Sequence, residues 1–145
     1  MLWSKQGGLV DPKGELLQQL RFERLAMANP KLAPYGQAAA EVLSKTGLWQ
    51  SVQPKLVLGE NIGQTYQFVA TANVPVGFVA KSQVWVDGAL REGSAWEVPA
   101  HLHKPIKQDA VLLIKGQDNE AAKALLNYLR SDKAKAVIRA YGYEL

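Results

Sequence analysis

The sequence of 145 residues predicts an α/β fold with a mainly parallel sheet. Three short apolar runs, at residues 25–28, 56–58 and 76–80, are bounded by turn residues, which is typical of buried strands. The segments between them carry apolar residues at helical spacing. Because strands covered on both faces lose the alternation of apolar and polar residues, such uniform runs favour a sheet with helices on both sides.

Composition limits the class of protein. The length fits one domain or part of a larger protein, and 48% hydrophobic with 21% charged residues gives enough apolar material for a core. No apolar run approaches the roughly 20 residues of a membrane helix. The absence of cysteine excludes disulfides and thiolate chemistry, and a net charge of +4 is too small to favour nucleic acid as a partner.

The first residues predict a strand that begins abruptly at Leu2 and Trp3. They show no basic region followed by an apolar region, so we expect no signal peptide here and interpret the chain as a fragment of a longer protein. Turn residues then predict a loop over residues 5–14. A short helix is expected at 15–22, ahead of the strand at 25–28.

The segment after the first apolar run is the strongest candidate for a binding site. Pro30 and Pro34 prevent regular pairing, so the chain must leave the strand in an extended turn. Apolar spacing then predicts a helix from near Tyr35 to about Thr46, with Gly47 at its C-terminal end. Such a helix start presents unpaired N–H groups and the positive end of the helix dipole, which suit an anion. An ordinary connecting loop is the alternative.

A second junction of the same kind follows the strand at 56–58. Gly59, Glu60 and Asn61 lead into a helix that carries Ile62 at its start. In a parallel sheet both helix starts lie at the C-terminal edge of the strands, where open α/β sheets bind ligands. Two such starts could hold a small oxyanion with no positive side chain.

The second half of the chain is less regular. A candidate strand lies at 96–98, and residues 107–115 carry the longest strand pattern of the chain. Two amphipathic helices follow, capped by Asn119 and Ser131. Acidic residues interrupt the basic residues of these helices, which favours a solvated face over a nucleic-acid surface.

Patterns for catalysis and side-chain metal binding are weak. The chain has no nucleophile elbow, phosphate loop or dinucleotide fingerprint. His101 and His103 have the spacing of two metal ligands but lack an evident third, so loop surface is preferred. Glu60 and Asp109 are single carboxylates, whereas acid–base catalysis by carboxyl groups needs a pair. We therefore expect no enzymatic activity and no side-chain metal site.

Four blocks of sequence, in this order and spacing, resemble a known family. They are residues 25–36 (LAMANPKLAPYG), 54–62 (PKLVLGENI), 77–80 (GFVA) and 138–143 (IRAYGY). Together they resemble the periplasmic molybdate-binding proteins of molybdenum ABC importers. The resemblance extends over essentially the whole chain but corresponds only to the C-terminal part of that family.

The resemblance implies a type II periplasmic-binding-protein fold, in which two α/β lobes close on molybdate or tungstate without a cofactor. The binding positions fall on Tyr35 and Ile62, both acting through the main-chain N–H. Some members use a tyrosine hydroxyl where this chain has Ala80, so that contact is expected to be absent. The candidate neighbours of the site are Pro34, Gly36, Asn61 and Ala80.

The resemblance also implies a division of the chain. Residues 1–106 would form the first crossover strand and the second lobe, and residues 107–145 the second crossover strand and the C-terminal helices. The N-terminal lobe, with its serine or threonine hydroxyls, would be absent, so we expect weakened binding of the oxyanion. Self-association or domain swapping could then cover apolar residues meant for that lobe, namely Leu125, Leu129, Val137 and Ile138.

The same resemblance predicts a function in transport. The chain would belong to the substrate-binding component of a molybdate or tungstate importer, periplasmic in its full-length form, with a membrane permease as partner and no nucleic acid. Two alternatives stay open at this point. One is the ligand-sensing domain of a transcriptional regulator, and the other is a receptor for another oxyanion such as sulfate or phosphate.

Overall fold

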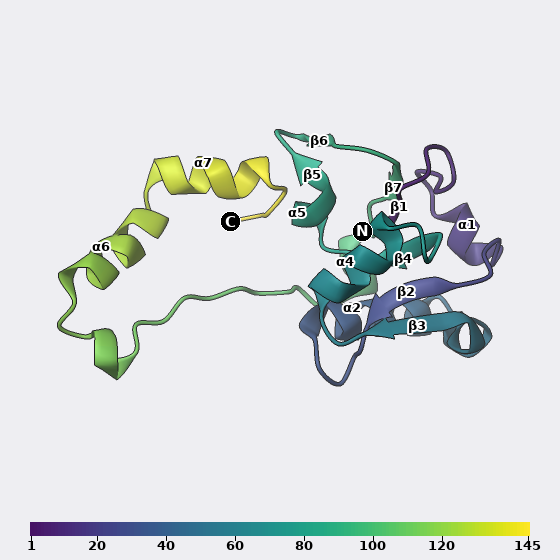
Figure 1. Cartoon of the computed structure of the whole chain (residues 1–145), viewed down its shortest axis with the longest axis horizontal. Coiled ribbons are helices and arrows are strands. Elements are labelled where there is room, and N and C mark those ends of the chain that lie inside the picture. The colour runs from purple at the N-terminus through teal and green to yellow at the C-terminus, as the bar shows by residue number, and fades with distance from the viewer.

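The computed structural model describes residues 1–145 and shows a layered α/β unit from which two C-terminal helices stand apart (Figure 1). Residues 1–102 form the layered unit. A long irregular segment leads from it to helices α6 (Glu120–Leu129) and α7 (Asp132–Ala140), after which the chain end returns toward the unit. None of the helices combines the length and apolar character needed to span a membrane.

The sheet of the layered unit has five strands in the order β3-β2-β4-β1-β7. Strand β2 pairs in parallel with β3 and β4, while β1 pairs antiparallel with β4 and β7. The predicted α/β class and the parallel arrangement of the three apolar strands are therefore confirmed. The strands are β1 (Leu2–Ser4), β2 (Leu25–Ala28), β3 (Leu56–Gly59), β4 (Val76–Phe78) and β7 (Ser94–Trp96).

Helices cover both faces of this sheet (Figure 1). The helices of the unit are α1 (Glu15–Gln18), α2 (Pro34–Lys45), α3 (Trp49–Val52), α4 (Ile62–Ala70) and α5 (Lys81–Val84). A small hairpin of β5 (Trp85–Val86) and β6 (Ala89–Leu90) follows, and Asp87 and Gly88 form its turn. Short 3₁₀ turns occur at Gln53–Lys55, Ala100–Leu102 and Ile114–Gly116.

Alternate residues of β2 pack into two separate cores. Leu25 and Met27 join a cluster of 14 buried residues that includes Val42 of α2. Ala26 points the other way, into a cluster of six that includes Val69 of α4. Since side chains alternate across a strand, this one strand anchors α2 on one face of the sheet and α4 on the other. Burial on both faces thereby holds the two helices against the same strand.

The prediction of a strand at residues 107–115 is wrong. Residues 103–113 have no regular structure, and the 3₁₀ turn at Ile114–Gly116 follows them. A strand needs a neighbour for its main-chain hydrogen bonds, and no segment of the chain pairs here. Val111 and Leu113 are consequently 79% and 68% exposed.

Two smaller boundaries also differ from the sequence prediction. The strand expected at 96–98 lies at Ser94–Trp96, where it pairs with β1. The helix expected at 15–22 ends at Gln18, because the main chain turns into the left-handed region at Leu20, with φ of 53°.

The predicted caps of the C-terminal helices are confirmed. The Asn119 side chain accepts hydrogen bonds from two N–H groups of the first turn of α6, and Ser131 accepts one in the first turn of α7. Helix α7 ends just before Gly142, which has a φ of 80°.

Candidate functional site

The starts of α2 and α4 lie beyond the same edge of the sheet, as the sequence predicts. Parallel pairing places Ala28 opposite Gly59, at the ends of β2 and β3. The N–H of Asn29 then donates a hydrogen bond of 2.7 Å to the Gly59 carbonyl, which ties together the two loops that lead into the helices. The candidate residues are thus brought to one edge of the sheet by adjacent strands, although they are far apart in sequence.

The first turn of α2 offers two unpaired main-chain donors. Pro34 occupies the first helical position and has no N–H, and the N–H of Gln37 already donates to the Ala33 carbonyl at 3.1 Å. The N–H groups of Tyr35 and Gly36 lie between them and have no acceptor within the chain. They are the orphan donors that every helix start leaves for water or a ligand.

The first turn of α4 repeats this arrangement. The side chain of Asn61 accepts from the N–H of Gln64 at 2.9 Å, and the Asn61 carbonyl accepts from the N–H of Thr65 at 3.1 Å. The N–H groups of Ile62 and Gly63 remain without an acceptor in the chain. Asn61 therefore acts as the cap of the helix, and Ile62 is the first free donor.

Gly36 allows α2 to approach the sheet closely. A Cβ atom added to Gly36 would overlap the carbonyl oxygen of Ala28, at the end of β2, and would lie 2.7 Å from the carbon of that carbonyl. No side chain fits in this space, so only glycine lets the helix begin at this distance from the strand. Its role near the site is therefore one of packing geometry, in addition to its free N–H.

Ala80 lies at a third junction, directly before α5, and is 4% exposed. Its N–H donates to Oε1 of Gln83 at 3.0 Å, so it is not a free donor. Nε2 of the same Gln83 donates to the Ile62 carbonyl at 3.2 Å. Ala80 is thus close to the start of α4 and contributes neither a hydroxyl nor an unpaired N–H.

The donors of the two helix starts are neutral. Neither first turn contains a lysine or arginine, so the positive potential comes from the helix dipoles and the N–H groups. Burial, followed by the neighbouring hydroxyl of Tyr143, raises the pKa of Tyr35 to about 12. The phenol therefore stays protonated at physiological pH and puts no negative charge beside the adjacent donors.

Two residues near Tyr35 were not predicted from the sequence. Nε2 of Gln108 donates to the Tyr35 hydroxyl at 3.1 Å across 73 positions of the chain, and the Tyr143 hydroxyl lies next to the same group. No local pattern marks either residue, because their segments reach Tyr35 only through the tertiary fold.

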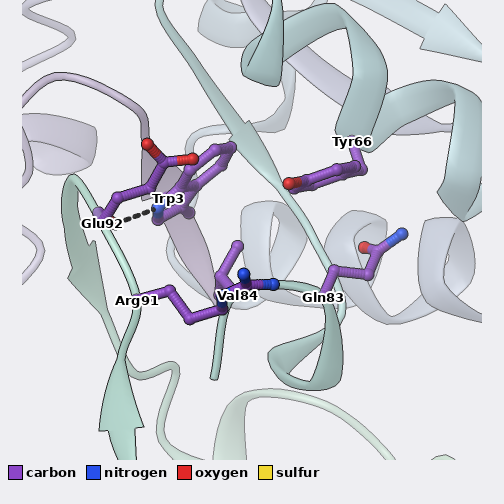
Figure 2. A pocket seen from close by; sticks show the side chains of 6 residues that line it. All are labelled: Trp3, Tyr66, Gln83, Val84, Arg91 and Glu92. Carbon is purple, nitrogen blue, oxygen red and sulfur yellow. Dashed lines mark hydrogen bonds between the residues drawn. The ribbon is translucent and has the colours of Figure 1, made fainter. Parts of the chain in front are cut away.

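A cavity of about 340 Å³ lies beside the start of β1 (Figure 2). Within it, the Trp3 indole donates to the Glu92 carbonyl at 3.0 Å and stacks on Tyr66 with ring centroids 5.5 Å apart. A smaller cavity of about 200 Å³ separates α2 from residues 104–107. Neither is lined by Tyr35 or Ile62, so the free donors open at the sheet edge rather than into these cavities.

The histidines at 101 and 103 do not gather further metal ligands. Nδ1 of His103 is within hydrogen-bond distance of the Lys104 carbonyl, at 2.8 Å. The structure contains no group of three histidine, cysteine or acidic side chains placed to hold a metal ion.

Comparison with known proteins gives relatives that match this chain over nearly its whole length. The molybdate-binding protein ModA of Azotobacter vinelandii is 54% identical over the full chain, and that of Rhodobacter capsulatus is 51% identical over 143 residues, 99% of the chain. The solved structure of the Azotobacter vinelandii periplasmic molybdate-binding protein superposes with a TM-score of 0.93 at 35% identity, over 99% of this chain and 63% of that one.

These relatives are longer than the chain, which covers 58% of the Azotobacter vinelandii protein and 55% of the Rhodobacter capsulatus protein. The chain also matches the family described as bacterial extracellular solute-binding protein over residues 2–144. The superposition shows that the sheet, its helix starts and the C-terminal helices follow the arrangement of a solved binding protein. Sequence and structure agree that the chain belongs to the bacterial extracellular solute-binding protein family.

Proposed function

We propose that the chain is part of the substrate-binding component of a molybdate or tungstate ABC importer. The observation that carries this proposal is the set of four unpaired N–H groups, of Tyr35, Gly36, Ile62 and Gly63, at two helix starts on one edge of the sheet. Neutral donors at helix starts suit a tetrahedral oxyanion. Molybdate is the ligand because the relatives that match the whole chain are named for binding it.

The wider setting is proposed on the same basis. We infer that an N-terminal lobe, outside these residues, supplies the remaining hydrogen bonds and shields the oxyanion from water. The length of the relatives and the 63% coverage of the solved structure support this. A membrane permease is the transport partner and the full-length protein is periplasmic. On this proposal, residues 1–106 are the first crossover strand and the second lobe, and residues 107–145 are the second crossover segment and the C-terminal helices.

Half of a site should bind weakly, because half of the donors and the exclusion of water are missing. An NMR titration of the ¹⁵N-labelled chain with molybdate is expected to shift the amide signals of Tyr35, Gly36, Ile62 and Gly63 first. Calorimetry should give a dissociation constant well above micromolar. Submicromolar affinity of this chain would contradict the half-site, and unshifted amides at these positions would contradict the site.

The substitution Ile62→Pro removes one proposed donor and leaves the helix intact. Proline is favoured at the first helical position, and the preceding Asn61 is already extended, with φ of −147° and ψ of 173°. Loss of one charge-assisted hydrogen bond should weaken molybdate binding by about tenfold or more. Ile62→Ala is the control, since it shortens the side chain but keeps the N–H. Equal affinities of the two variants would exclude Ile62 as a donor.

Competition distinguishes molybdate from other oxyanions. Tungstate, which has nearly the same size and charge, should displace molybdate from the ¹⁵N-labelled chain, whereas sulfate should not. Displacement by sulfate at the same concentration would favour a sulfate receptor. The names of the matching relatives do not favour the sensor domain of a transcriptional regulator.

Self-association is a further part of the proposal. Leu125, Leu129 and Val137 are exposed apolar residues on α6 and α7, and Ile138 is half-buried. For the chain of these 145 residues studied by itself, we expect a second copy to bury these side chains.

A further inference from the structure

The side chain of Tyr35 has contacts that the proposed role of its main chain does not require. Its hydroxyl accepts a hydrogen bond from Nε2 of Gln108 at 3.1 Å, and the hydroxyl of Tyr143 lies beside it. Gln108 belongs to the segment that leaves the layered unit. Tyr143 belongs to the tail that returns to it after α7, as the path of the chain shows (Figure 1). The segment that leaves the layered unit and the tail that returns to it therefore both lie next to the Tyr35 side chain.

The tail also packs against α5. The hydroxyls of Tyr143 and Ser82 are 3.0 Å apart. Gly142 packs against the aliphatic part of Lys81, where an added Cβ would lie 2.9 Å from two side-chain carbons. Helix α5 follows Ala80 and is linked to the start of α4 through Gln83. The tail therefore contacts Tyr35 at the start of α2 and helix α5, which is hydrogen-bonded to the start of α4.

Few polar contacts connect the C-terminal segment with the layered unit. Three hydrogen bonds join residues 1–102 to residues 103–145, namely Glu41 with Lys104, Tyr35 with Gln108 and Ser82 with Tyr143. Two of these three involve the group formed by Tyr35, Gln108, Tyr143 and Ser82, which we call the tyrosine clasp. The position of α6 and α7 relative to the sheet therefore depends strongly on this clasp.

We propose that Gln108 and Tyr143 are positioning residues that act through Tyr35, and that the tyrosine clasp couples oxyanion binding to the placement of α6 and α7. This inference rests on the proposed function, because it assigns a role to the side chain of Tyr35, the residue whose main-chain N–H would bind the anion. Holding the phenol restrains the first turn of α2, where the free N–H groups of Tyr35 and Gly36 lie. By linkage, an anion that orders this turn must stabilise the clasp to the same extent.

Phenylalanine substitutions test the clasp because they remove only a hydroxyl. Tyr35→Phe retains the N–H donor, and Tyr143→Phe retains the packing of the ring. Tyr128→Phe is the matched control, since Tyr128 is exposed on α6 and its hydroxyl has no hydrogen-bond partner in the structure. Thermal unfolding of each variant verifies that the layered unit stays folded.

Molybdate affinity, measured by amide shifts of the ¹⁵N-labelled full chain, is the first measurement. Tyr35→Phe and Tyr143→Phe should each raise the dissociation constant by about threefold to tenfold, with no change for Tyr128→Phe. The loss in the double variant should be smaller than the sum of the two single losses, because the two hydroxyls belong to one group of contacting side chains. Unchanged affinity of both single variants, or fully additive losses, would overturn the coupling.

Hydrogen exchange of peptides that cover residues 132–145 is the second measurement. Without molybdate, exchange should be faster in Tyr35→Phe and Tyr143→Phe than in the unsubstituted chain or Tyr128→Phe. Molybdate should slow exchange in the unsubstituted chain and have little effect in Tyr35→Phe. Equal exchange in all four proteins without ligand would overturn the clasp. Failure of the unsubstituted chain to bind molybdate would instead overturn the proposed function, and the ligand-free comparison would still decide whether the clasp holds the tail.

Discussion

Gly36 is the residue on which the geometry of the start of α2 depends most directly. Because a Cβ atom at this position would overlap the Ala28 carbonyl, any side chain must push the helix away from β2. We expect Gly36→Ala to destabilise the fold by about 1–3 kcal/mol, the usual cost of overpacking. It should also weaken molybdate binding, because the N–H groups of Tyr35 and Gly36 move with the turn. Urea unfolding and an NMR titration measure the two effects.

Gly7→Ala provides the matched control for this substitution. A Cβ at Gly7 would meet no atom within 4 Å, so the same chemical change is made without a clash. Its stability and affinity should stay within experimental error of the unsubstituted chain. An equal loss in both variants would mean that the effect at Gly36 is not due to its approach to the strand.

At the scale of the element, α1 depends on an acidic residue ahead of it. Asp11 accepts hydrogen bonds from the N–H groups of Lys13 and Glu15 at 2.9 Å and of Leu16 at 2.8 Å. Burial raises the pKa of Asp11, but the hydrogen bonds from Glu15, Leu16 and Lys13 outweigh it and lower the pKa to about 2. The ionised carboxylate thus organises the turn that starts this short helix.

This lowered pKa gives a pH-dependent prediction. The unfolded state, with an ordinary pKa of 3.8, takes up the proton more readily, so the contribution of Asp11 is present above about pH 4 and is lost as the pH falls toward 2. Asp11→Asn keeps one acceptor oxygen but loses the other and the negative charge, so it should cost about 1 kcal/mol at neutral pH, the net worth of one hydrogen bond. Urea unfolding of both proteins between pH 7 and pH 2 should show this difference shrinking in acid. A difference that is constant with pH would contradict the assignment to the carboxylate.

The elements also show what sequence could and could not predict. The helix starts at Pro34 and Ile62 were predictable, because proline, a capping asparagine and apolar spacing are local signals. Residues 107–115 have an equally strong local signal and form no strand, because a strand exists only with a partner. The contact of Gln108 with Tyr35 was beyond prediction for the same reason, since only the tertiary fold brings the two together.

At the scale of the whole molecule, the apolar face of α6 and α7 leads to a prediction about association. Leu125 is 58% exposed near the centre of α6. Light scattering of the chain should show a molar mass that rises with concentration, and Leu125→Glu should abolish the rise because it places a charge in the buried contact. A monomer at all concentrations would rule out association through this face.

The control for this experiment is Leu32→Glu. Leu32 is 65% exposed but lies in the loop before α2, outside α6 and α7. The substitution Leu32→Glu makes the same change, from an exposed leucine to a negative charge, on a different element of the chain. The rise in molar mass should persist in this variant, and its loss would indicate a general effect of added negative charge.

The free N–H groups of α2 and α4 have a consequence for how this protein can vary through evolution. A ligand held by amide hydrogens does not depend on the chemistry of the side chains that carry them. At position 62, selection on binding would accept any residue that preserves the turn and would reject only proline, which lacks the hydrogen. Searches for conserved polar residues would overlook this position, and descendants could change its side chain freely while keeping the same ligand.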